Sequence, residues 1–589
     1  MSVGRRGGAL AVSRLGGGGS MLDGTDPRLH EASTWTAEAS GVSLPTAAVA
    51  ASALALAACG GGSGTTAIGG GASGAATPPV VVVAAAPTSA EASRFLGQAT
   101  MGATSTSIQS VTASNYSAWI DTQFAMSRAT SHWDWLNANG YNVAANINSE
   151  AGFDATMWRQ LIAEPDQLRQ RVGMALLDLA VVGIGGVNLN WKQFAMAAYV
   201  DGLLDNAFGN YRQILDFVTM NAAMGSFLTF LGNKKANATT GAVPDENYAR
   251  ELMQLFSLGL YQLNMDGSVK LSGGVALETY TPADVSGLAR VFTGLNLANS
   301  TSTTPDRYRL PLVMSAGSHE TGTSTFLGTS VSGEGIAAIK TALDAIFAHP
   351  NVPPFVSKQL IQRLVTSNPS AGYVGRVAAA FADNGQGVRG DMKAVIRAIL
   401  LDTEARSADA LSSTSAGKLR EPVMRLTGWA RAFGATSPSN AWAIGDTSST
   451  TTRLGQTMGR SATVFNFFRP GYSPPASAIS RAGLVAPEFQ ITNEQTVVAY
   501  VNYMYALVLN GTGDVKADYT GITAKAGDAQ ALVDEVNLLL AAGQLSTATV
   551  ASIVAAVNSI ATTATNASQN RVQAAILLTL ASPDYLTAK

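Results

Sequence analysis

The sequence predicts a predominantly α-helical protein: one large, irregular multi-helix domain with a minor short β element, preceded by a signal segment and a flexible tether. Two observations support this fold class. From Thr88 onward, apolar residues recur at three- and four-residue intervals, the spacing of one helical face. Before Thr88, an apolar run and an uncharged segment of small residues show no such period. With 589 residues, the chain is long enough to bury a large core.

Residues 1–58 are predicted to be a signal peptide of the lipoprotein type. The apolar run from Val42 to Ala58 is shorter and smaller-sided than a membrane span, which needs ~20 apolar residues. It ends in Leu56-Ala57-Ala58-Cys59, which looks like a bacterial lipobox, and Cys59 is the one cysteine in the chain. Lipidation of Cys59 would anchor the protein to a membrane. Glycine rather than aspartate follows it, which favours the outer membrane. The alternative is an Ala-rich leader with a chance cysteine.

The next two predicted regions are a tether and a helical domain. After Cys59, residues 60–87 are Gly, Ala, Ser, Thr and Pro with one isoleucine, four valines and no charge, so residues 59–87 have a composition typical of flexible linkers. Residues 88–589 form the helical domain, in which residues 306–328 are the predicted short strand pair and residues 434–453 and 510–525 read as loops. The predicted helices cover 89–99, 105–111, 116–126, 151–163, 166–182, 191–206, 210–220, 245–258, 282–293, 333–347, 353–365, 373–382, 391–402, 418–433, 493–509, 528–541, 547–560 and 569–581.

Composition and motifs exclude several classes of function. The 38 basic residues are matched by 40 acidic ones, so no positive surplus indicates a nucleic-acid partner. Gly385, Gly387 and Gly390 have the spacing of a dinucleotide fingerprint, but the text before them predicts a helix rather than a strand, so they indicate a helix end and a turn. The sequence predicts no cofactor and no metal site.

One amphipathic helix, "PDENYARELMQLFSLG" at residues 244–259, raises a question about its polar stripe. Asn247, Arg250, Glu251 and Gln254 lie on one face and apolar residues on the other. The stripe could be a wet surface, since Glu246 and Arg250 have the spacing of an exposed pair. It could instead be buried, because only 13% of residues are charged and many charges sit within apolar text.

The buried alternative predicts a polar network. In it, Arg250 pairs with an acid on a neighbouring helix and Glu251 pairs with an arginine, as structural cement or as the wall of a cleft. The predicted network comprises Asn247, Arg250, Glu251, Arg290, Arg420 and Glu421.

Two further stretches carry candidate chemistry. Glu251 and Asp284 are acid–base candidates for a paired-carboxylate mechanism, and His319, on a Gly-flanked loop, is the histidine best suited to join them. The stretch "VFNFFRPGYSPP" at residues 464–475 gathers aromatics around an arginine. It indicates a crossover pinned to the core by aromatic anchors, or alternatively a sugar- or peptide-binding platform.

Seven ordered blocks resemble one bacterial family, domain of unknown function 1800. They run colinearly from about Arg94 to Leu586: "NYRQILDFVTMNAAMGSFLTFLGN", "PDENYARELMQLFSLGL", "YTPADVSGLARVFTGLN", "HETGTSTFLG", "GKLREPVMRL", "FNFFRPGYSPP" and "LASPDYL". The resemblance implies an exported, predominantly helical protein. Members are often encoded beside a second exported family that resembles sulfatases and alkaline phosphatases, so such a protein is an implied partner. The resemblance carries over no activity and no catalytic residue.

Two functional hypotheses follow. The first is an exported accessory or scaffold protein, anchored by lipid in the cell envelope as an outer-membrane lipoprotein, that partners a phosphatase- or sulfatase-like protein. The alternative is a carboxylate-based hydrolase of the cell envelope that uses Glu251, Asp284 and His319. The hydrolase requires these three side chains to converge on one open pocket.

Overall fold

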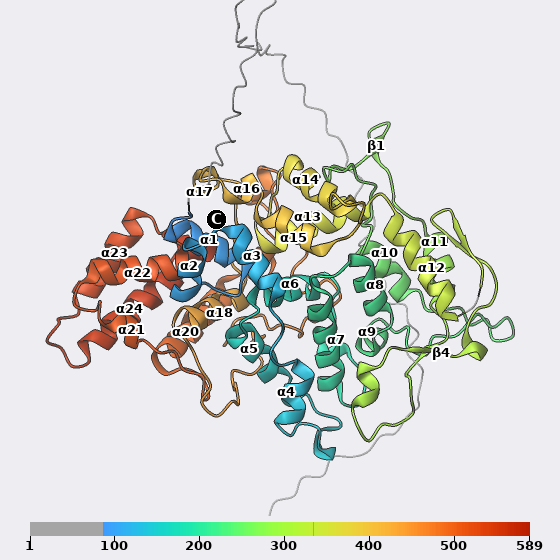
Figure 1. Ribbon diagram of the computed structural model, residues 1–589, viewed down its shortest axis with the longest axis horizontal. Helices are drawn as coiled ribbons and strands as arrows, with labels where there is room; N and C mark the ends of the chain where they lie inside the picture. Colours follow the sequence, from blue (N-terminus) through green and yellow to red (C-terminus); the bar gives the residue numbers. More distant parts are fainter. Residues whose placement is uncertain (1–85, 334) are drawn as a thin grey trace, which may run out of the picture. The chain divides into compact units, whose positions relative to one another are not determined.

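The computed structural model describes residues 86–333 and 335–589 (Figure 1). Three predicted features lie outside the described residues: the signal peptide, lipidation at Cys59 and the first 27 residues of the tether. No helix in the described part of the chain is long and apolar enough to cross a membrane.

Helices dominate the described chain, which confirms the predicted fold class (Figure 1). In chain order they are α1 (Ser89–Ala99), α2 (Ser105–Thr112), α3 (Tyr116–Ala125), α4 (His132–Ala138), α5 (Phe153–Ala163), α6 (Gln167–Leu177), α7 (Lys192–Asn206), α8 (Tyr211–Thr219), α9 (Ala222–Phe227), α10 (Asn247–Gln254), α11 (Pro282–Val291), α12 (Gly335–Ala348), α13 (Val352–Leu364), α14 (Ala371–Ala382), α15 (Met392–Leu400), α16 (Thr403–Arg406), α17 (Asp409–Ser412), α18 (Pro422–Ala432), α19 (Ala478–Arg481), α20 (Glu494–Asn510), α21 (Thr520–Thr523), α22 (Ala529–Ala541), α23 (Thr547–Asn558), α24 (Ala567–Ala581) and α25 (Pro583–Leu586). The helices that the periodicity missed, such as α4 and α9, have two turns or fewer, too few for a period to show.

The β structure consists of four two-stranded antiparallel pairs within the described residues. They are β1 (Leu271–Ser272) with β2 (Val275–Ala276), β3 (Leu295–Asn296) with β4 (Val313–Met314), β5 (Ser324–Phe326) with β6 (Thr329–Val331), and β7 (Lys418–Leu419) with β8 (Thr587–Ala588). The predicted element at 306–328 is present, but its two stretches do not pair with each other as expected. β4 pairs with β3, which follows α11, and β5 pairs with β6.

Helix ends follow the expected capping chemistry. The Thr88 hydroxyl accepts a hydrogen bond from Glu91 N while the Glu91 carboxylate accepts from Thr88 N, a capping box that starts α1. Thr281 and Asp284 do the same for α11, where Pro282 occupies the first turn. α10 ends earlier than predicted, at Gln254, because the chain turns back at Leu258 and Gly259, whose amides both bond to Met253 O.

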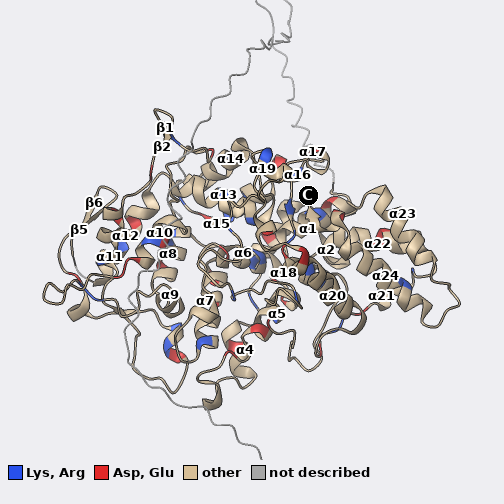
Figure 2. Ribbon diagram, turned by 180° about the vertical axis from the view of Figure 1, so that it is seen from behind, with Lys and Arg blue, Asp and Glu red and all other residues tan. Residues whose placement is uncertain are grey.

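One continuous apolar cluster joins the helices. It runs from Ala92 on α1 to Tyr585 on α25 and includes the fully buried Trp158, Trp191 and Trp429. α7 packs against α4, α6, α8 and α9, α13 packs against α14, and α22, α23 and α24 pack together. Figure 2 shows charged residues on α6 and α18 within this helical frame. Charges placed among packed helices must find partners or shift their pKa values.

Candidate functional site

The polar stripe of α10 divides between solvent and core. Asn247 and Arg250 are exposed, and Arg250 Nη2 lies 3.0 Å from Glu246 Oε2 one turn back on the same segment. Ser286 Oγ on α11 donates to the other Glu246 oxygen at 2.5 Å. The prediction that Arg250 pairs with an acid on a neighbouring helix is therefore wrong. Arg250 instead pairs with Glu246, which precedes it by the favourable four residues.

Glu251 is buried without an arginine. Its residue is 7% exposed and Oε2 has no hydrogen-bond partner, so the predicted ion pair is absent. Burial raises the pKa of Glu251 to about 7, although the nearby Arg250 charge opposes the change. A carboxyl with this pKa titrates near neutrality and carries a cost to folding when it is charged.

Glu251→Gln is expected to melt at or above the wild-type temperature at pH 8, because the amide removes the cost of a charged buried carboxylate. At pH 5 both side chains are neutral, so this advantage should disappear. Thermal melting at the two pH values tests the expectation. Glu246→Gln is the exposed control and should cost less than ~1 kcal/mol at either pH. A lower melting temperature for Glu251→Gln at pH 8 would mean that the carboxylate has a stabilising partner.

Asp284 lies at the start of α11, and His319 contacts the chain just beyond the end of the same helix. Hydrogen bonds from Thr281 and from Leu327 N (2.7 Å) outweigh burial and keep the pKa of Asp284 below its usual value. His319 is buried beyond the other end, where its Nδ1 donates to Thr293 O at 2.8 Å and its Nε2 has no partner. Nearby, Arg290 pairs with Glu320 at 3.6 Å. Asp284 is therefore a helix cap.

The three acid–base candidates do not assemble into a site. Asp284 lies in the first turn of α11, whereas Thr293, the hydrogen-bond partner of His319, lies just beyond the last turn. At 1.5 Å per residue, about 13 Å along the helix axis separates Asp284 from Thr293. No hydrogen bond or ion pair links Glu251 to either one within the described chain. The hydrolase that uses Glu251, Asp284 and His319 thus lacks the shared pocket that it requires.

Arg420 and Glu421 lie in a different neighbourhood, at the start of α18. Arg420 Nε donates to Tyr585 O at 2.7 Å, and its guanidinium lies 5.0 Å from the centre of the Tyr585 ring. Glu421 is fully buried and accepts a hydrogen bond from Gln456 Nε2 at 2.9 Å. The six residues of the predicted network therefore form separate structural contacts rather than one network.

Glu421 belongs to a buried cluster of ionisable side chains that the sequence did not reveal as a unit. Lys418 Nζ lies 3.0 Å from Glu488 Oε1 and 3.5 Å from Glu421 Oε1, and all three residues are buried. Lys418 and Arg171 both donate to the carbonyl oxygen of Arg363, at 2.9 and 2.5 Å. The Arg363 guanidinium in turn donates to the carbonyl oxygen of Asp178 at 2.8 Å. These contacts connect the buried cluster to Asp178.

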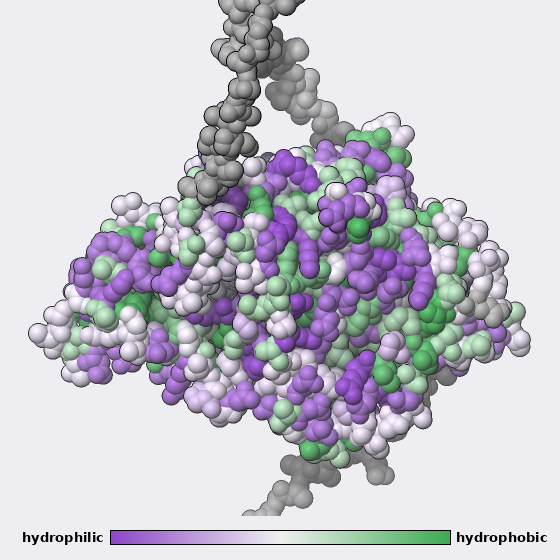
Figure 3. All heavy atoms as spheres, viewed as in Figure 1, coloured by the Kyte–Doolittle hydropathy of each residue, from purple (hydrophilic) through white to green (hydrophobic). Residues whose placement is uncertain are grey.

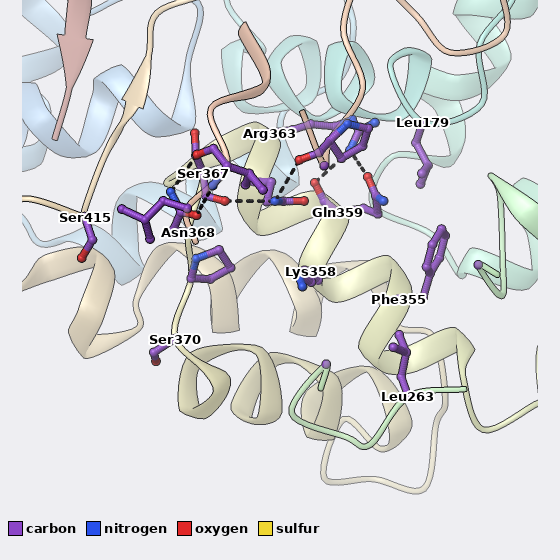
Figure 4. A pocket seen from close by; sticks show the side chains of 18 of the residues that line it. Leu179, Leu263, Phe355, Lys358, Gln359, Arg363, Ser367, Asn368, Ser370 and Ser415 are labelled. Atoms are coloured by element: carbon purple, nitrogen blue, oxygen red, sulfur yellow. Dashed lines mark hydrogen bonds between the residues drawn. The ribbon is translucent and has the colours of Figure 1, made fainter. Parts of the chain in front are cut away.

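A cavity of about 1290 Å³ opens beside this cluster (Figure 4). Its lining comes from the end of α6, the segment after α10, α13, the α16–α17 region and the loop that precedes α20. Asp178 and Arg363 belong to both the cavity wall and the buried cluster. The volume exceeds the ~300–1,000 Å³ of common small-molecule sites, so the cavity is large enough for a substantial organic ligand.

Asp178 is the most buried carboxyl of the cavity wall. It is 4% exposed, Asn466 Nδ2 donates to its Oδ1 at 2.7 Å, and Oδ2 has no partner. Burial raises the pKa of Asp178 to about 7; the nearby Glu421 carboxyl adds to this rise, and Arg363 opposes it. Asn466 adopts a φ of 61°, a conformation that asparagine tolerates better than most residues. Asp178 can therefore exchange a proton near neutral pH.

The cavity has two chemically different walls, which Figure 4 shows on opposite sides. Ser367, Asn368, Ser370 and Ser415 lie on one side, and Leu179, Leu263 and Phe355 lie on the other. Further hydroxyls of the polar wall come from Thr403, Ser407 and Ser413, and further apolar side chains of the lining come from Leu255 and Leu258. The arrangement suits a ligand with a polar and an apolar side.

The stretch "VFNFFRPGYSPP" combines features of both alternatives that its sequence left open. Val464, Phe465 and Pro470 line the cavity, while Phe468 is buried. The Arg469 guanidinium lies 4.6 Å from the centre of the Phe465 ring. The segment is thus a crossover anchored in the core that also contributes an aromatic to the cavity wall.

The glycine motif at residues 385–390 has a structural explanation. Gly385, Gly387 and Gly390 all have positive φ in the turn between α14 and α15, which confirms the predicted helix end and turn. In the described part of the chain, no group of three or more His, Cys, Asp or Glu side chains is placed to hold a metal ion.

Sequence reasoning missed the cavity residues Asp178 and Ser367. Asp178 was visible as the lone charge in "VGMALLDLAVV", residues 172–182. A carboxyl in such a stretch needs a buried partner or a raised pKa, and this argument applies to Asp178 as it does to Glu251.

Comparison with known proteins gives one match. No curated protein and no solved structure matches the chain. The family described as protein of unknown function (DUF1800) matches residues 94–587. Because the match covers nearly all of the chain beyond its first 93 residues, the protein belongs to the DUF1800 family.

Proposed function

We propose that this protein is an exported, lipid-anchored accessory protein whose helical domain binds an organic ligand in the cavity beside Asp178 and Arg363. The observation that carries the proposal is the cavity itself: about 1290 Å³, with one polar and one apolar wall and buried ionisable groups on its surface. Large concave sites with a few convergent polar groups and perturbed pKa values are the usual form of ligand-binding sites.

A cavity-filling variant tests ligand binding. Ser415 is exposed and lines the cavity, so Ser415→Trp places an indole in it without removing a core contact. Thr414→Trp, at the exposed neighbouring residue that does not line the cavity, is the matched control. Native mass spectrometry of protein purified from its own cell envelope is expected to show a bound organic molecule in the wild type and in Thr414→Trp. The molecule should be absent from Ser415→Trp, and equal occupancy in all three proteins, or in none, would contradict the proposal.

A second candidate function is carboxylate chemistry at Asp178. The specific observation is its pKa of about 7 together with an unpartnered Oδ2 on the cavity wall. A general acid–base group works best when its pKa is near the working pH. Glu404 and Asp409 line the same cavity, although Glu404 already accepts hydrogen bonds from the amide and hydroxyl of Ser370. In this hydrolase, Asp178 takes the place of Glu251, Asp284 and His319. Retention of an intact ligand by Asp178→Asn, with product released by the wild type, would distinguish catalysis from binding.

Cys59→Ser is expected to release the protein from the membrane fraction and to leave the leader uncleaved at this point. Acyl chains on the cysteine give ~0.8 kcal/mol per buried CH₂, and stable anchoring needs two such chains or a second signal. Fractionation and mass spectrometry of the N-terminus check both expectations. Unchanged partitioning into detergent would end the proposal of an anchor at Cys59 and of an outer-membrane location.

The proposed partner is an exported phosphatase- or sulfatase-like protein. An accessory protein tethered beside such an enzyme would present or retain the ligand that its cavity holds. Cross-linking in whole cells followed by purification of this chain is expected to recover the partner. Recovery of the same proteins with an unrelated lipoprotein would argue against a specific complex.

A further inference from the structure

Three side chains of the cavity wall have buried polar atoms without a partner in the protein. They are Asp178 Oδ2, Arg363 Nε and Ser367 Oγ. Asp178 is 4% exposed and Ser367 is 3% exposed. Arg363 Nη2 donates to the carbonyl oxygen of Asp178. Gln362, next to Arg363, donates to the carbonyl oxygen of Ser367 at 2.9 Å. The three residues therefore lie in one neighbourhood of the cavity wall. An unpaired buried polar group destabilises the folded state, and a ligand head group that bonds to it would offset this cost.

The charge of this neighbourhood favours an anionic head group. The cations are the buried Arg171 and Lys418 and the half-buried Arg363, and the buried carboxylates beside them are Glu421 and Glu488. When Asp178 is protonated, three positive charges face two negative ones, and one positive charge is unbalanced. Arg363 Nε–H, the Ser367 hydroxyl and protonated Asp178 then offer three hydrogen-bond donors, which a carboxylate accepts.

An apolar path leads from this cavity to the surface. Leu255, Leu258 and Phe355 line its interior, and the exposed Leu260, Tyr261 and Val269 line its mouth. The ribbon formed by residues 260–276 continues outward through Leu271 and Val275, which are 62% and 70% exposed. Figure 3 shows apolar residues at the surface where Figure 1 places β1.

This ribbon concentrates exposed apolar side chains. Of the 16 large apolar residues that are exposed in the described chain, six lie between residues 260 and 275. Such a cluster marks a site of interaction, because isolated exposed apolar residues need no explanation but contiguous ones do. Its continuity with the mouth connects the ribbon to the cavity and to the ligand that the cavity holds.

From these observations, and resting on the proposed function, we propose that the ligand is an amphiphile with a carboxylate head and a long apolar chain. The head binds at Asp178, Arg363 and Ser367. The chain lies along Leu255, Leu258 and Phe355 and leaves the mouth over the ribbon. A long-chain carboxylic acid is the simplest molecule with this chemistry.

Calorimetric titration of the full chain carrying Cys59→Ser, at pH 6 and without detergent, tests the ligand class. The probes are octanoate, decanoate, dodecanoate, dodecanol and maltohexaose. Affinity is expected to rise about fourfold per added methylene along the carboxylate series. Dodecanol, which has the same chain without the charge, should bind at least tenfold more weakly than dodecanoate.

Variants separate head from chain. Ser367→Ala removes a hydroxyl that has no partner in the protein, so the fold should persist. The preference of this variant for dodecanoate over dodecanol should be severalfold smaller than that of the wild type. Arg363→Gln should abolish that preference. Tyr261→Ser at the mouth should weaken the binding of dodecanoate more than that of octanoate. Val243→Ser is the control and should change neither, because Val243 is also exposed (79%, against 45% for Tyr261) but does not line the cavity.

Three outcomes would overturn the proposal. Binding of maltohexaose but not dodecanoate, blocked by Ser415→Trp, would keep the cavity as the ligand site and reject the amphiphile. Failure of every probe, with no envelope molecule bound, would reject the proposed function as well. If ribbon variants reduce vesicle binding or self-association but leave dodecanoate affinity unchanged, the ribbon serves a lipid surface or a second copy and not a chain emerging from the cavity.

Discussion

Replacing Lys418 with methionine is expected to lower the free energy of unfolding by ~3–5 kcal/mol, among the largest effects of any single substitution in this protein. Lys418 Nζ is the shared partner of Glu488 at 3.0 Å and Glu421 at 3.5 Å, and both carboxyl residues are buried. Burial raises the pKa of Glu488, and the Lys418 charge is the main influence that opposes this rise. Without the ammonium group, Glu488 and Glu421 both lose the one ion-pair partner that they have in the described chain, and Glu421 keeps only its hydrogen bond from Gln456.

Denaturant titration of matched variants checks this result. Lys525 pairs with Glu535 at 2.6 Å but is exposed, so Lys525→Met should cost less than ~1 kcal/mol. Adding Glu488→Gln to Lys418→Met should recover part of the loss, because it removes one of the stranded charges. If Lys418→Met behaves like Lys525→Met, the buried cluster is not held by charge pairing, and the charge argument for an anionic ligand loses its basis.

The sequence predicted the helical fold well because helical periodicity is a local property. α10, α11 and α18 each show an apolar stripe within about fifteen positions, α11 also has the capping residue Thr281, and the structure places helices there. The β element near 306–328 was found for the same reason, but its pairing was wrong. β4 pairs with β3, which lies outside that stretch, and local patterns do not encode a partner at such a distance.

The site was predictable only in part, because its residues come from distant segments. Asp178, Ser367 and Ser415 line one cavity although ~50 to 240 residues separate them along the chain. Burial of Glu251 could be inferred from the scarcity of charge, but its lack of an ion pair could not. Lys418 and Glu421 lie three positions apart in "GKLREP", so this part of the buried cluster could be predicted from the sequence. Glu488, the other partner of Lys418, lies about 70 residues later and could not be predicted from local spacing.

The stability of the wild type relative to Asp178→Asn is expected to fall as pH rises from about 4 to about 7. Burial raises the pKa of Asp178 from 3.8 to about 7, so in this window the folded chain holds a proton that the unfolded chain has lost. Stability therefore decreases with pH through the window and is constant on either side of it. At ~1.4 kcal/mol for each pH unit, the change approaches ~4 kcal/mol across the window.

Asparagine isolates this titration because it keeps the carbonyl oxygen that accepts from Asn466 and cannot ionise. The groups that face Asp178 are unchanged in the variant: Arg171, Arg363 and Glu421. Asp514→Asn is a control of opposite sign. Hydrogen bonds from Ser437 and Ser439 outweigh burial and lower the pKa of Asp514 to about 2, so its stabilising contribution is lost only as pH falls below about 4. Urea midpoints at pH 4, 5.5, 7 and 8 measure both differences, and the difference between the wild type and Asp514→Asn should be constant over this range. A flat difference between the wild type and Asp178→Asn would show that Asp178 stays ionised through this range, and neither its proton-transfer role nor its hydrogen bond to a carboxylate head could then hold near neutral pH.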